Sequence, residues 1–155
     1  MSTSSDAAAI ALADLPGLVG KHLGQSDWEL IDQGKINRFA DATGDHQWIH
    51  VDIERAKAGP FGTTIAHGYM TLSLVPIFVF QLLKVEGAKL VVNYGLNKAR
   101  FPAPVPVDSR VRMAGEIAAV EQVSGGLQVT LSCTFEIEGQ TKPACVAEIV
   151  FRYYE

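Results

Sequence analysis

Residues 69–83 read YMTLSLVPIFVFQLL, an uncharged stretch in which apolar residues occupy most positions. Such a segment is typical of a helix that is buried on most of its sides. Pro76 removes one backbone donor inside the stretch, so a kink or an early break is expected there. The run is too short to cross a bilayer with a hydrocarbon core about 30 Å thick, so it does not predict a membrane span.

After this helix the pattern of the sequence changes to a period of two. Residues 127–137 (LQVTLSCTFEI) alternate apolar and polar side chains without a break, and residues 145–153 repeat the alternation. Ser124-Gly125-Gly126 supplies a turn before the first of these segments. Residues 88–101 and 109–123 are strand-like with weaker alternation. The second half therefore predicts four antiparallel strands, each with one buried face.

One apolar helix followed by four strands predicts an α+β protein. A single flat sheet face cannot bury a helix that is apolar all round, so the sheet is expected to curl around it, as in a hot-dog fold. An open sheet edge invites pairing, so two copies are expected to join as a homodimer. We expect a flexible N-terminal tail over residues 1–14 and one hot-dog domain over residues 15–155.

The first half reads as helical and rich in loops. Residues 26–31 (SDWELI) predict a short strand, and Asp32 is placed to cap a helix that ends at Thr43 and Gly44. Asp52 is placed to cap a second short helix over residues 53–58, which Gly59 and Pro60 would stop.

Composition narrows the class of protein. Hydrophobic residues make up 48% of the chain and charged residues 19%, with a net charge of −4, which is typical of a globular domain. The absence of a basic tract argues against a nucleic-acid partner. No secretory signal is recognised at the N-terminus, so a cytoplasmic location is expected. Cys133 and Cys145 fall on the apolar sides of strands and are interpreted as buried thiols.

Residues 44–52 (GDHQWIHVD) contain two aspartates and two histidines in one short segment. Asp45 and His50 are expected in a loop, where a carboxylate and an imidazole aimed at one water form a general acid–base pair. The alternative is that Asp45 caps the turn and His50 is a packed strand residue. His46 is interpreted as a loop histidine and Asp52 as a helix cap.

Gly68 lies where the apolar helix begins. Free backbone N–H groups at that end could stabilise negative charge on a thioester carbonyl, as in an oxyanion hole. The alternative is close packing of Gly68 against the sheet. The chain has four histidines, but their spacings match no common metal site, so no metal is expected.

The segments FADATGDHQWIHVD (residues 39–52) and GPFGTTIAHGYMTLSL (residues 59–74) together resemble the MaoC-like (R)-specific enoyl-CoA hydratases and 3-hydroxyacyl-thioester dehydratases. The segment YGLNKARFPAPVPVDSRVR (residues 94–112) is also similar to that family, and in particular to its branch related to nodulation protein N. Gln47 and Trp48 stand where the family more often has Asn and Pro.

The resemblance implies a role for each matched residue. Asp45 and His50 would be the catalytic pair that holds the water, and Gly68 would supply the oxyanion N–H. For three other matched residues the resemblance leaves two alternative roles. Ser73 would support the site or bond its own helical turn, and Asn97 and Arg100 would meet the ligand or belong to the scaffold.

The implied reaction is reversible syn addition of water to a trans-2-enoyl thioester of CoA or acyl carrier protein, giving an (R)-3-hydroxyacyl thioester in fatty-acid metabolism. The resemblance implies no cofactor, because the thioester itself makes the α-carbon acidic. The rivals are a hot-dog thioesterase and a non-catalytic subunit that binds acyl thioesters. A thioesterase commonly places a carboxylate on or beside the long helix, and residues 69–83 contain no acid.

Overall fold

A computed structural model describes residues 7–155 of the chain. In order, the helices and strands are β1 (Ala9–Ala11), the 3-10 helix η1 (Leu12–Leu18), β2 (His22–Gln25), β3 (Glu29–Ile31), α1 (Gln33–Thr43), α2 (Trp48–Val51), α3 (Ile53–Lys57), α4 (Gly68–Ser73), α5 (Val75–Leu82), β4 (Lys84–Glu86), β5 (Leu90–Arg100), β6 (Ser109–Val123), β7 (Gly126–Ile137) and β8 (Cys145–Tyr154).

One antiparallel sheet forms the body of the molecule. Its strands run in the order β2-β6-β7-β8-β5, and β3 also pairs with β6. The predicted four strands correspond to β5 to β8, and the alternation over residues 127–137 becomes a strand with mainly buried apolar side chains. The period-two prediction is therefore confirmed, and β5 is left as an edge strand.

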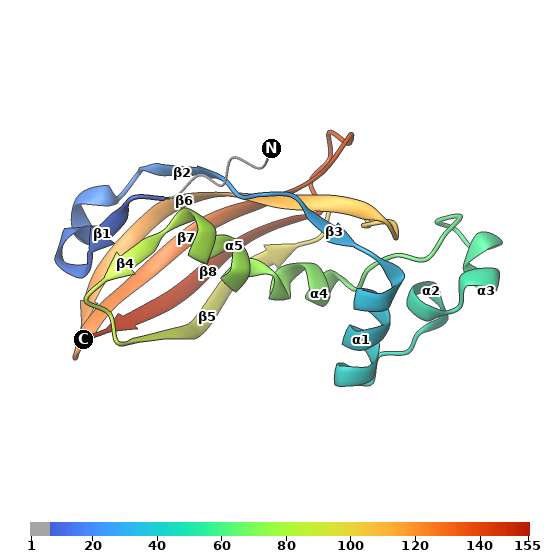
Figure 1. The fold of residues 1–155 in the computed structure, drawn as a ribbon, viewed down its shortest axis with the longest axis horizontal. Coiled ribbons are helices and arrows are strands. Elements are labelled where there is room, and N and C mark those ends of the chain that lie inside the picture. The colour runs from blue at the N-terminus through green and yellow to red at the C-terminus, as the bar shows by residue number, and fades with distance from the viewer. Residues whose placement is uncertain (1–6) are drawn as a thin grey trace.

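The apolar stretch forms two helices in place of one. Helix α4 ends at Ser73, Leu74 links the two, and Pro76 stands in the first turn of α5, where its missing N–H costs no helical hydrogen bond. The predicted break is confirmed. The ribbon shows α5 lying over the curved face of the sheet (Figure 1).

The helix face toward the sheet supplies the centre of the core. Phe78 is fully buried, and its ring lies 5.9 Å from that of Phe135 on β7 in an edge-to-face arrangement. Truncation of such a buried Phe to Ala costs about 3–5 kcal/mol of folding free energy. The opposite helix face is open, because Ile77 and Phe80 are 45% and 55% exposed. The expectation of burial on most sides is therefore wrong for a single protomer, since the sheet covers one side only.

The N-terminal segment differs from its prediction. Residues 9–11 form β1, which pairs in parallel with β4, and η1 follows directly. Leu12 and Leu15 are buried in the core. The prediction of a flexible tail over residues 1–14 is therefore wrong for residues 9–14, because β1 pairs with β4 and Leu12 packs into the core. Residues 1–6 lie outside the described part of the chain.

The remaining helices form a separate lobe. Helices α1, α2 and α3 lie beyond one end of the sheet, and β3 and α4 connect them to the body of the molecule (Figure 1). The predicted caps are confirmed, because Asp32 accepts a hydrogen bond from the Lys35 N–H at 2.8 Å and Asp52 accepts one from the Arg55 N–H at 3.1 Å. The predicted strand over residues 26–31 is shorter, covering Glu29–Ile31. Among residues 7–155, none of the helices has both the length and the apolar character to traverse a membrane.

Candidate active site

The segment after α1 sets the position of the predicted acid–base pair. Gly44 ends α1 with φ 83°, a left-handed conformation that glycine adopts without steric cost. Asp45 follows, and its Oδ1 accepts a hydrogen bond from the Gln47 N–H at 3.3 Å. His50 lies on α2, so the expectation of a loop histidine, or alternatively of a strand residue, is wrong at this position. Asp45 therefore caps the turn and also lies near His50, so the two roles that the sequence left open for Asp45 are compatible.

His50 is buried and fixed by backbone contacts. Its Nδ1 lies 2.8 Å from the carbonyl oxygen of Ile65, and its own carbonyl accepts a hydrogen bond from Gln33 Nε2 at 2.7 Å. Because a carbonyl oxygen can only accept, Nδ1 carries the proton in the neutral ring. The Nε2 lone pair of His50 is therefore the one available to a water or a substrate.

Gln33 also connects this histidine to the segment before α4. Its Oε1 accepts a hydrogen bond from the Thr64 hydroxyl at 2.6 Å. Thr64 is itself buried and belongs to the stretch that leads to Ile65. The Gln33 side chain thus links the backbone of His50 to the segment that carries Ile65, whose carbonyl binds the His50 ring.

The carboxylate of Asp45 lies near His50. One carboxylate oxygen of Asp45 and one ring nitrogen from each of His50 and His67 lie within 4.8 Å of one another. A separation of this size leaves room for one water that contacts both the acid and the imidazole. The predicted meeting of Asp45 and His50 is therefore present in the structure.

His67 is the site residue whose position the sequence did not predict. It is 2% exposed, its Nε2 lies 2.9 Å from the carbonyl oxygen of Asp45, and its ring stacks on that of His50 with centroids 3.8 Å apart. The only signal in the sequence was its place beside Gly68, at the start of the apolar helix.

Three potential ligands in one cluster raise the question of a metal. The planes of the His50 and His67 rings are inclined by only 22°. Because imidazole lone pairs lie in the ring plane, stacked rings direct them side by side, whereas metal binding needs them to converge on one ion. A carbonyl oxygen engages one nitrogen of each ring and leaves the other nitrogen of each ring free to accept a proton or a hydrogen bond. The geometry fits acid–base chemistry better than a metal centre.

Burial lowers the pKa of His50 below its ordinary value of 6.5, because the charged ring would lose its hydration. The hydrogen bond to the Ile65 carbonyl opposes this shift, His67 adds to it, and Asp45 opposes it. The net effect keeps His50 neutral near pH 7, which is the state that a general base requires.

Gly68 borders a cavity beside His50. This cavity has a volume of about 270 Å³ and is walled mainly by apolar side chains from the segment before α4 and from the segment after β5. As the first residue of α4, Gly68 has an N–H with no partner inside the helix. An added Cβ at Gly68 would lie 3.1 Å from the Phe101 ring, so close packing and a free N–H both apply here. The lining residues are His50, Phe61, Ile65, Ala66, Gly68, Thr71, Phe101, Ala103, Pro104, Val105 and Ala144.

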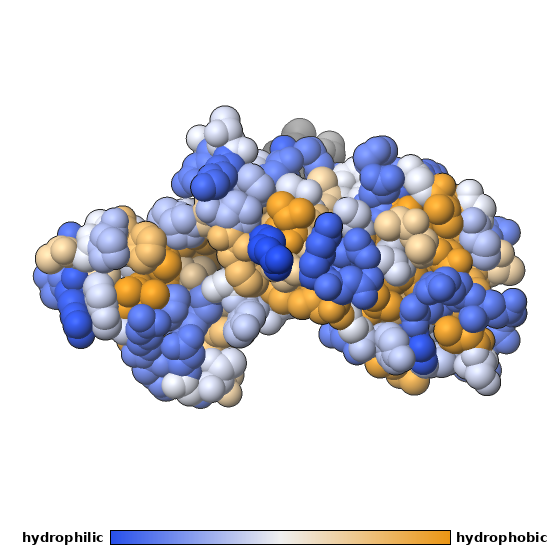
Figure 2. Space-filling model, turned by 180° about the vertical axis from the view of Figure 1, so that it is seen from behind, coloured by the Kyte–Doolittle hydropathy of each residue, from blue (hydrophilic) through white to orange (hydrophobic). Residues whose placement is uncertain are grey.

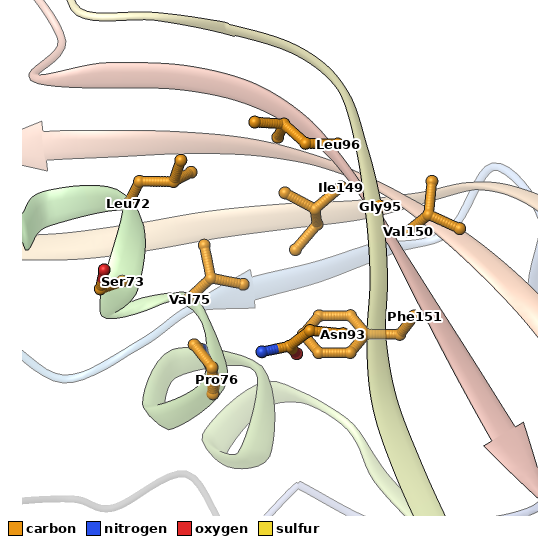
Figure 3. Close-up of a pocket in the computed structure, with 10 residues that line it drawn as sticks. All are labelled: Leu72, Ser73, Val75, Pro76, Asn93, Gly95, Leu96, Ile149, Val150 and Phe151. Atoms are coloured by element: carbon orange, nitrogen blue, oxygen red, sulfur yellow. The ribbon is translucent and has the colours of Figure 1, made fainter. Parts of the chain in front are cut away.

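A second cavity, of about 290 Å³, lies between the helices and the strands β5 and β8. Ser73 is on its wall, opposite Leu96 and Ile149 (Figure 3). The Ser73 hydroxyl donates to the Tyr69 carbonyl at 2.6 Å, which is the contact with its own helical turn. Ser73 does not border the cavity that contains His50.

Asn97 and Arg100 are exposed on β5 and border neither of these two cavities. Asn97 Nδ2 donates to Glu148 on the neighbouring strand at 2.7 Å, which favours the scaffold role. The Arg100 guanidinium donates to the Ala99 carbonyl at 2.8 Å. Neither residue is brought to Asp45 and His50 within one protomer.

His46 and the two cysteines have no part in the acid–base pair. His46 is exposed, and its hydrogen bond with Asp41 at 2.9 Å raises the pKa of its ring. Cys133 and Cys145 are fully buried as predicted, and burial raises their thiol pKa values to about 12 and about 11. Both thiols are therefore protonated and inert at neutral pH.

Residues 14–135 match the family profile described as "MaoC like domain". The chain belongs to the MaoC-like dehydratase family. Among its MaoC-like relatives, 3-hydroxyacyl-thioester dehydratase Z of Mycobacterium tuberculosis (strain ATCC 25618 / H37Rv) is 60% identical over 144 residues, covering 92% of this chain and 95% of the relative. Nodulation protein N of Rhizobium leguminosarum bv. viciae is 46% identical over 143 residues, covering 89% and 88% of the two chains. The resemblance stated from the sequence is confirmed.

Solved structures of MaoC-like proteins share the architecture. The (R)-hydratase from A. caviae involved in PHA biosynthesis superposes with a TM-score of 0.71 at 22% identity, covering 86% of this chain and 94% of that one. The unliganded R-hydratase PhaJ1 from Pseudomonas aeruginosa gives a TM-score of 0.71 at 20% identity, covering 88% and 82%. At this level of identity the likeness establishes the fold, and the predicted hot-dog fold is confirmed.

Proposed function

We propose that this MaoC-like protein is an (R)-specific enoyl-thioester hydratase, which in reverse acts as a (3R)-hydroxyacyl-thioester dehydratase. The observation that carries the proposal is the cluster of Asp45 and His50, whose polar atoms lie within 4.8 Å of each other, with His50 on the wall of an apolar cavity. The name of the 60% identical relative, 3-hydroxyacyl-thioester dehydratase Z, supports the same chemistry.

The pair acts on one water molecule. The Nε2 lone pair of His50 is free because Nδ1–H donates to the Ile65 carbonyl. Asp45 and His50 together take a proton from water as its oxygen bonds to C3 of the enoyl thioester, and they deliver a proton to C2 from the same side. Hydration is therefore syn, and dehydration follows the same path backwards.

The negative charge that develops during attack lies on the thioester oxygen. Gly68 supplies the backbone N–H that meets this oxygen, because the first N–H groups of a helix have no internal partner and border the His50 cavity. The thioester makes the α-carbon acidic by itself, so the mechanism uses no metal and no redox cofactor.

The substrate's two ends leave the reacting centre in different directions. The cavity that Ser73 borders offers apolar walls for an acyl tail, including Leu72 and Val75, which Figure 3 shows on the helix side. Arg100 is exposed and carries a guanidinium that suits the phosphates of CoA or of a phosphopantetheine arm. Asn97 keeps its cross-strand contact and orients this segment.

The open helix face and the edge strand support a homodimer. Large apolar side chains are exposed on α4, α5 and β5, among them Tyr69, Phe80, Tyr94 and Leu96, which are 73%, 55%, 54% and 47% exposed. Apolar residues gather across the narrow middle of the molecule (Figure 2). A second copy would cover this surface and remove the exposed edge of β5.

Light scattering tests the dimer. Leu96→Lys places a charge on the edge strand and is expected to give monomers, whereas Leu30→Lys, at a similarly exposed position on β3, should leave the dimer intact. A monomeric wild-type protein, or a Leu96→Lys variant that stays dimeric, would contradict the homodimer. A cytoplasmic location stays a prediction from the sequence.

The catalytic proposal is tested with crotonyl-CoA. Loss of the conjugated enoyl absorbance and chiral analysis of the product should show (R)-3-hydroxybutyryl-CoA. Asp45→Asn and His50→Gln should each lower kcat by about 10²–10⁴-fold without loss of folding, as measured by circular dichroism. His22→Gln is the matched control, because His22 is exposed on β2 and borders neither His50 nor its cavity.

Two other outcomes would overturn this function. Release of free CoA would indicate a thioesterase, although Gly68–Ser73 and Val75–Leu82 contain no carboxylate. Binding of the thioester without turnover, unaffected by Asp45→Asn, would indicate a non-catalytic subunit.

A further inference from the structure

His67 is buried at the centre of the site, although the proposed reaction gives it no proton to transfer. It precedes α4 in extended backbone conformation, with φ −61° and ψ 138°, and is 2% exposed. Its ring packs between two others, with the centroid of Phe39 at 4.8 Å and that of His50 at 3.8 Å. A histidine held so closely on two sides has little rotational freedom.

The contacts of His67 select one neutral form of its ring. Nε2 lies 2.9 Å from the Asp45 carbonyl oxygen, which only accepts, so Nε2 carries the proton. Within residues 7–155, Nδ1 of His67 is buried and has no hydrogen-bond partner. A second proton on Nδ1 would therefore be a buried donor without an acceptor, which is unfavourable.

The two histidines are thus held in complementary forms. His50 carries its proton on Nδ1 and His67 carries its proton on Nε2, each directed at a backbone carbonyl. The carbonyl that His67 binds belongs to Asp45, so this bond fixes the backbone from which the catalytic carboxylate extends. The stacked ring fixes the plane of His50 at the same time.

We propose that His67 is a positioning residue for hydration: its Nε2–H anchors the Asp45 backbone, and its neutral ring supports the His50 ring at the angle that water transfer requires. This inference rests on the proposed function. The His67 ring stacks on the His50 ring, so a change at His67 alters the burial of the base as well as the position of the acid. A misplacement of about 1 Å at a reacting group can lower a rate about 10²-fold.

Two variants separate the two contacts. His67→Phe keeps an aromatic ring in the stack but removes the donor to Asp45. His67→Gln keeps an amide donor at a similar distance from the backbone but removes the ring. We expect each to lower kcat for crotonyl-CoA hydration by about ten- to 100-fold, with KM changed less than about threefold, because the loss is one of alignment.

The pH profile distinguishes positioning from general damage. Burial lowers the pKa of His50, and the stacked His67 ring contributes to that burial, so loss of the ring in His67→Gln should move the acid limb of kcat/KM to higher pH, whereas His67→Phe should leave it in place. Long-range ¹H–¹⁵N spectra of the histidine rings give a second readout that does not depend on turnover. They should show Nδ1–H for His50 in the wild type and a higher pKa for His50 in His67→Gln.

Different results would contradict the hydratase function and the positioning role of His67. If wild-type protein does not hydrate crotonyl-CoA, the function is wrong, and the spectra alone decide whether His67 fixes the His50 tautomer and pKa. If the wild type is active and both folded variants keep its kcat and acid limb, His67 has no positioning role. In His67→Gln, a loss of kcat with an unmoved acid limb and unchanged His50 spectra would also overturn it. Should His67→Phe not fold, as judged by circular dichroism, His67→Gln decides the same question.

Discussion

The two cavities beside the helices have similar volumes, about 270 Å³ and about 290 Å³, yet they differ in chemistry. The first contains His50 and the N–H end of α4. The second contains no titratable side chain, and its one hydroxyl, that of Ser73, is used within its own helix. Volume alone therefore does not indicate the reacting centre, whereas buried polar groups with fixed partners do.

The difference follows from how each cavity is built. The walls of the Ser73 cavity come from the regular elements α4, α5, β5 and β8, which supply mainly apolar side chains. The His50 cavity lies where α2, α4 and the segment after β5 meet, and chain ends there leave backbone N–H and carbonyl groups free to orient side chains.

Apart from the changes at Asp45 and His50, the largest expected effect concerns the Gly68 N–H. Gly68→Pro removes that donor at the first helical position, where proline is tolerated, and His67 already has the extended conformation that a following proline requires. We expect kcat for crotonyl-CoA to fall by about 10²–10³-fold, as for other oxyanion donors.

Gly68→Ala is the matched control for this change, because it introduces the same Cβ contact with Phe101 but keeps the N–H. Phe101 is 39% exposed and can move aside. Equal kcat values for the alanine and proline variants would remove Gly68 from the mechanism.

A second expected difference between the cavities is pH dependence. Burial lowers the pKa of His50 from 6.5, so the neutral base persists to lower pH and is lost as the pH falls through its folded pKa. The acid limb of kcat/KM for hydration should have its midpoint below pH 6.5, with a fall of about tenfold per unit beneath it. A midpoint above 6.5 in the wild type would show that another group is the base.

The same shift has a consequence for stability. Below pH 6.5 the unfolded chain binds a proton at His50 that the folded chain resists, so His50 favours folding above that pH and loses this contribution as the pH falls through its folded pKa. Urea unfolding of wild type and His50→Gln as a function of pH would measure it. A pH dependence that is identical in the two proteins would contradict the burial effect.

A smaller effect is expected at Arg100, on the exposed strand. Arg100→Ala should raise KM for CoA thioesters by about fivefold or less and leave kcat unchanged, since an exposed ion pair contributes about 1 kcal/mol at most. Lys21→Ala, an exposed charge at the start of β2, serves as control. A fall in kcat with unchanged KM would place Arg100 in the chemistry instead.

The smallest expected effect on the kinetics is that of a change at Ser73, in the second cavity. Ser73→Ala removes a hydroxyl that bonds only its own turn, so kcat/KM for crotonyl-CoA should stay within about twofold of wild type. Steady-state kinetics measure this directly. A loss comparable to that of Gly68→Pro would show that the Ser73 hydroxyl takes part in the chemistry.

The fold could be predicted from the sequence to a large extent because its signals are local. Residues 127–137 alternate with the period of a strand, and Pro76 marks the break between two helices. The expected burial of the helix was wrong at Ile77 and Phe80, because sequence alone does not show which helix face the sheet covers.

The site was predictable only where its residues are close in the chain. Asp45 and His50 could be paired because five positions separate them. His67 lies 22 residues from the Asp45 carbonyl that it contacts, and the stacking of its ring on His50 depends on how α2 packs beside α4. Such contacts come from tertiary packing, which no local pattern of residue types encodes.

Hydration of crotonyl-CoA in ²H₂O measures the action of Asp45 and His50 most directly. Since their polar atoms lie within 4.8 Å of each other and His50 lines the cavity, one face of the double bond should receive both the hydroxyl at C3 and a single deuterium at C2. NMR analysis of the product should show this syn arrangement in the (R)-3-hydroxybutyryl thioester. An anti product, or a deuterium distributed over both C2 positions during a single turnover, would contradict a shared acid–base pair.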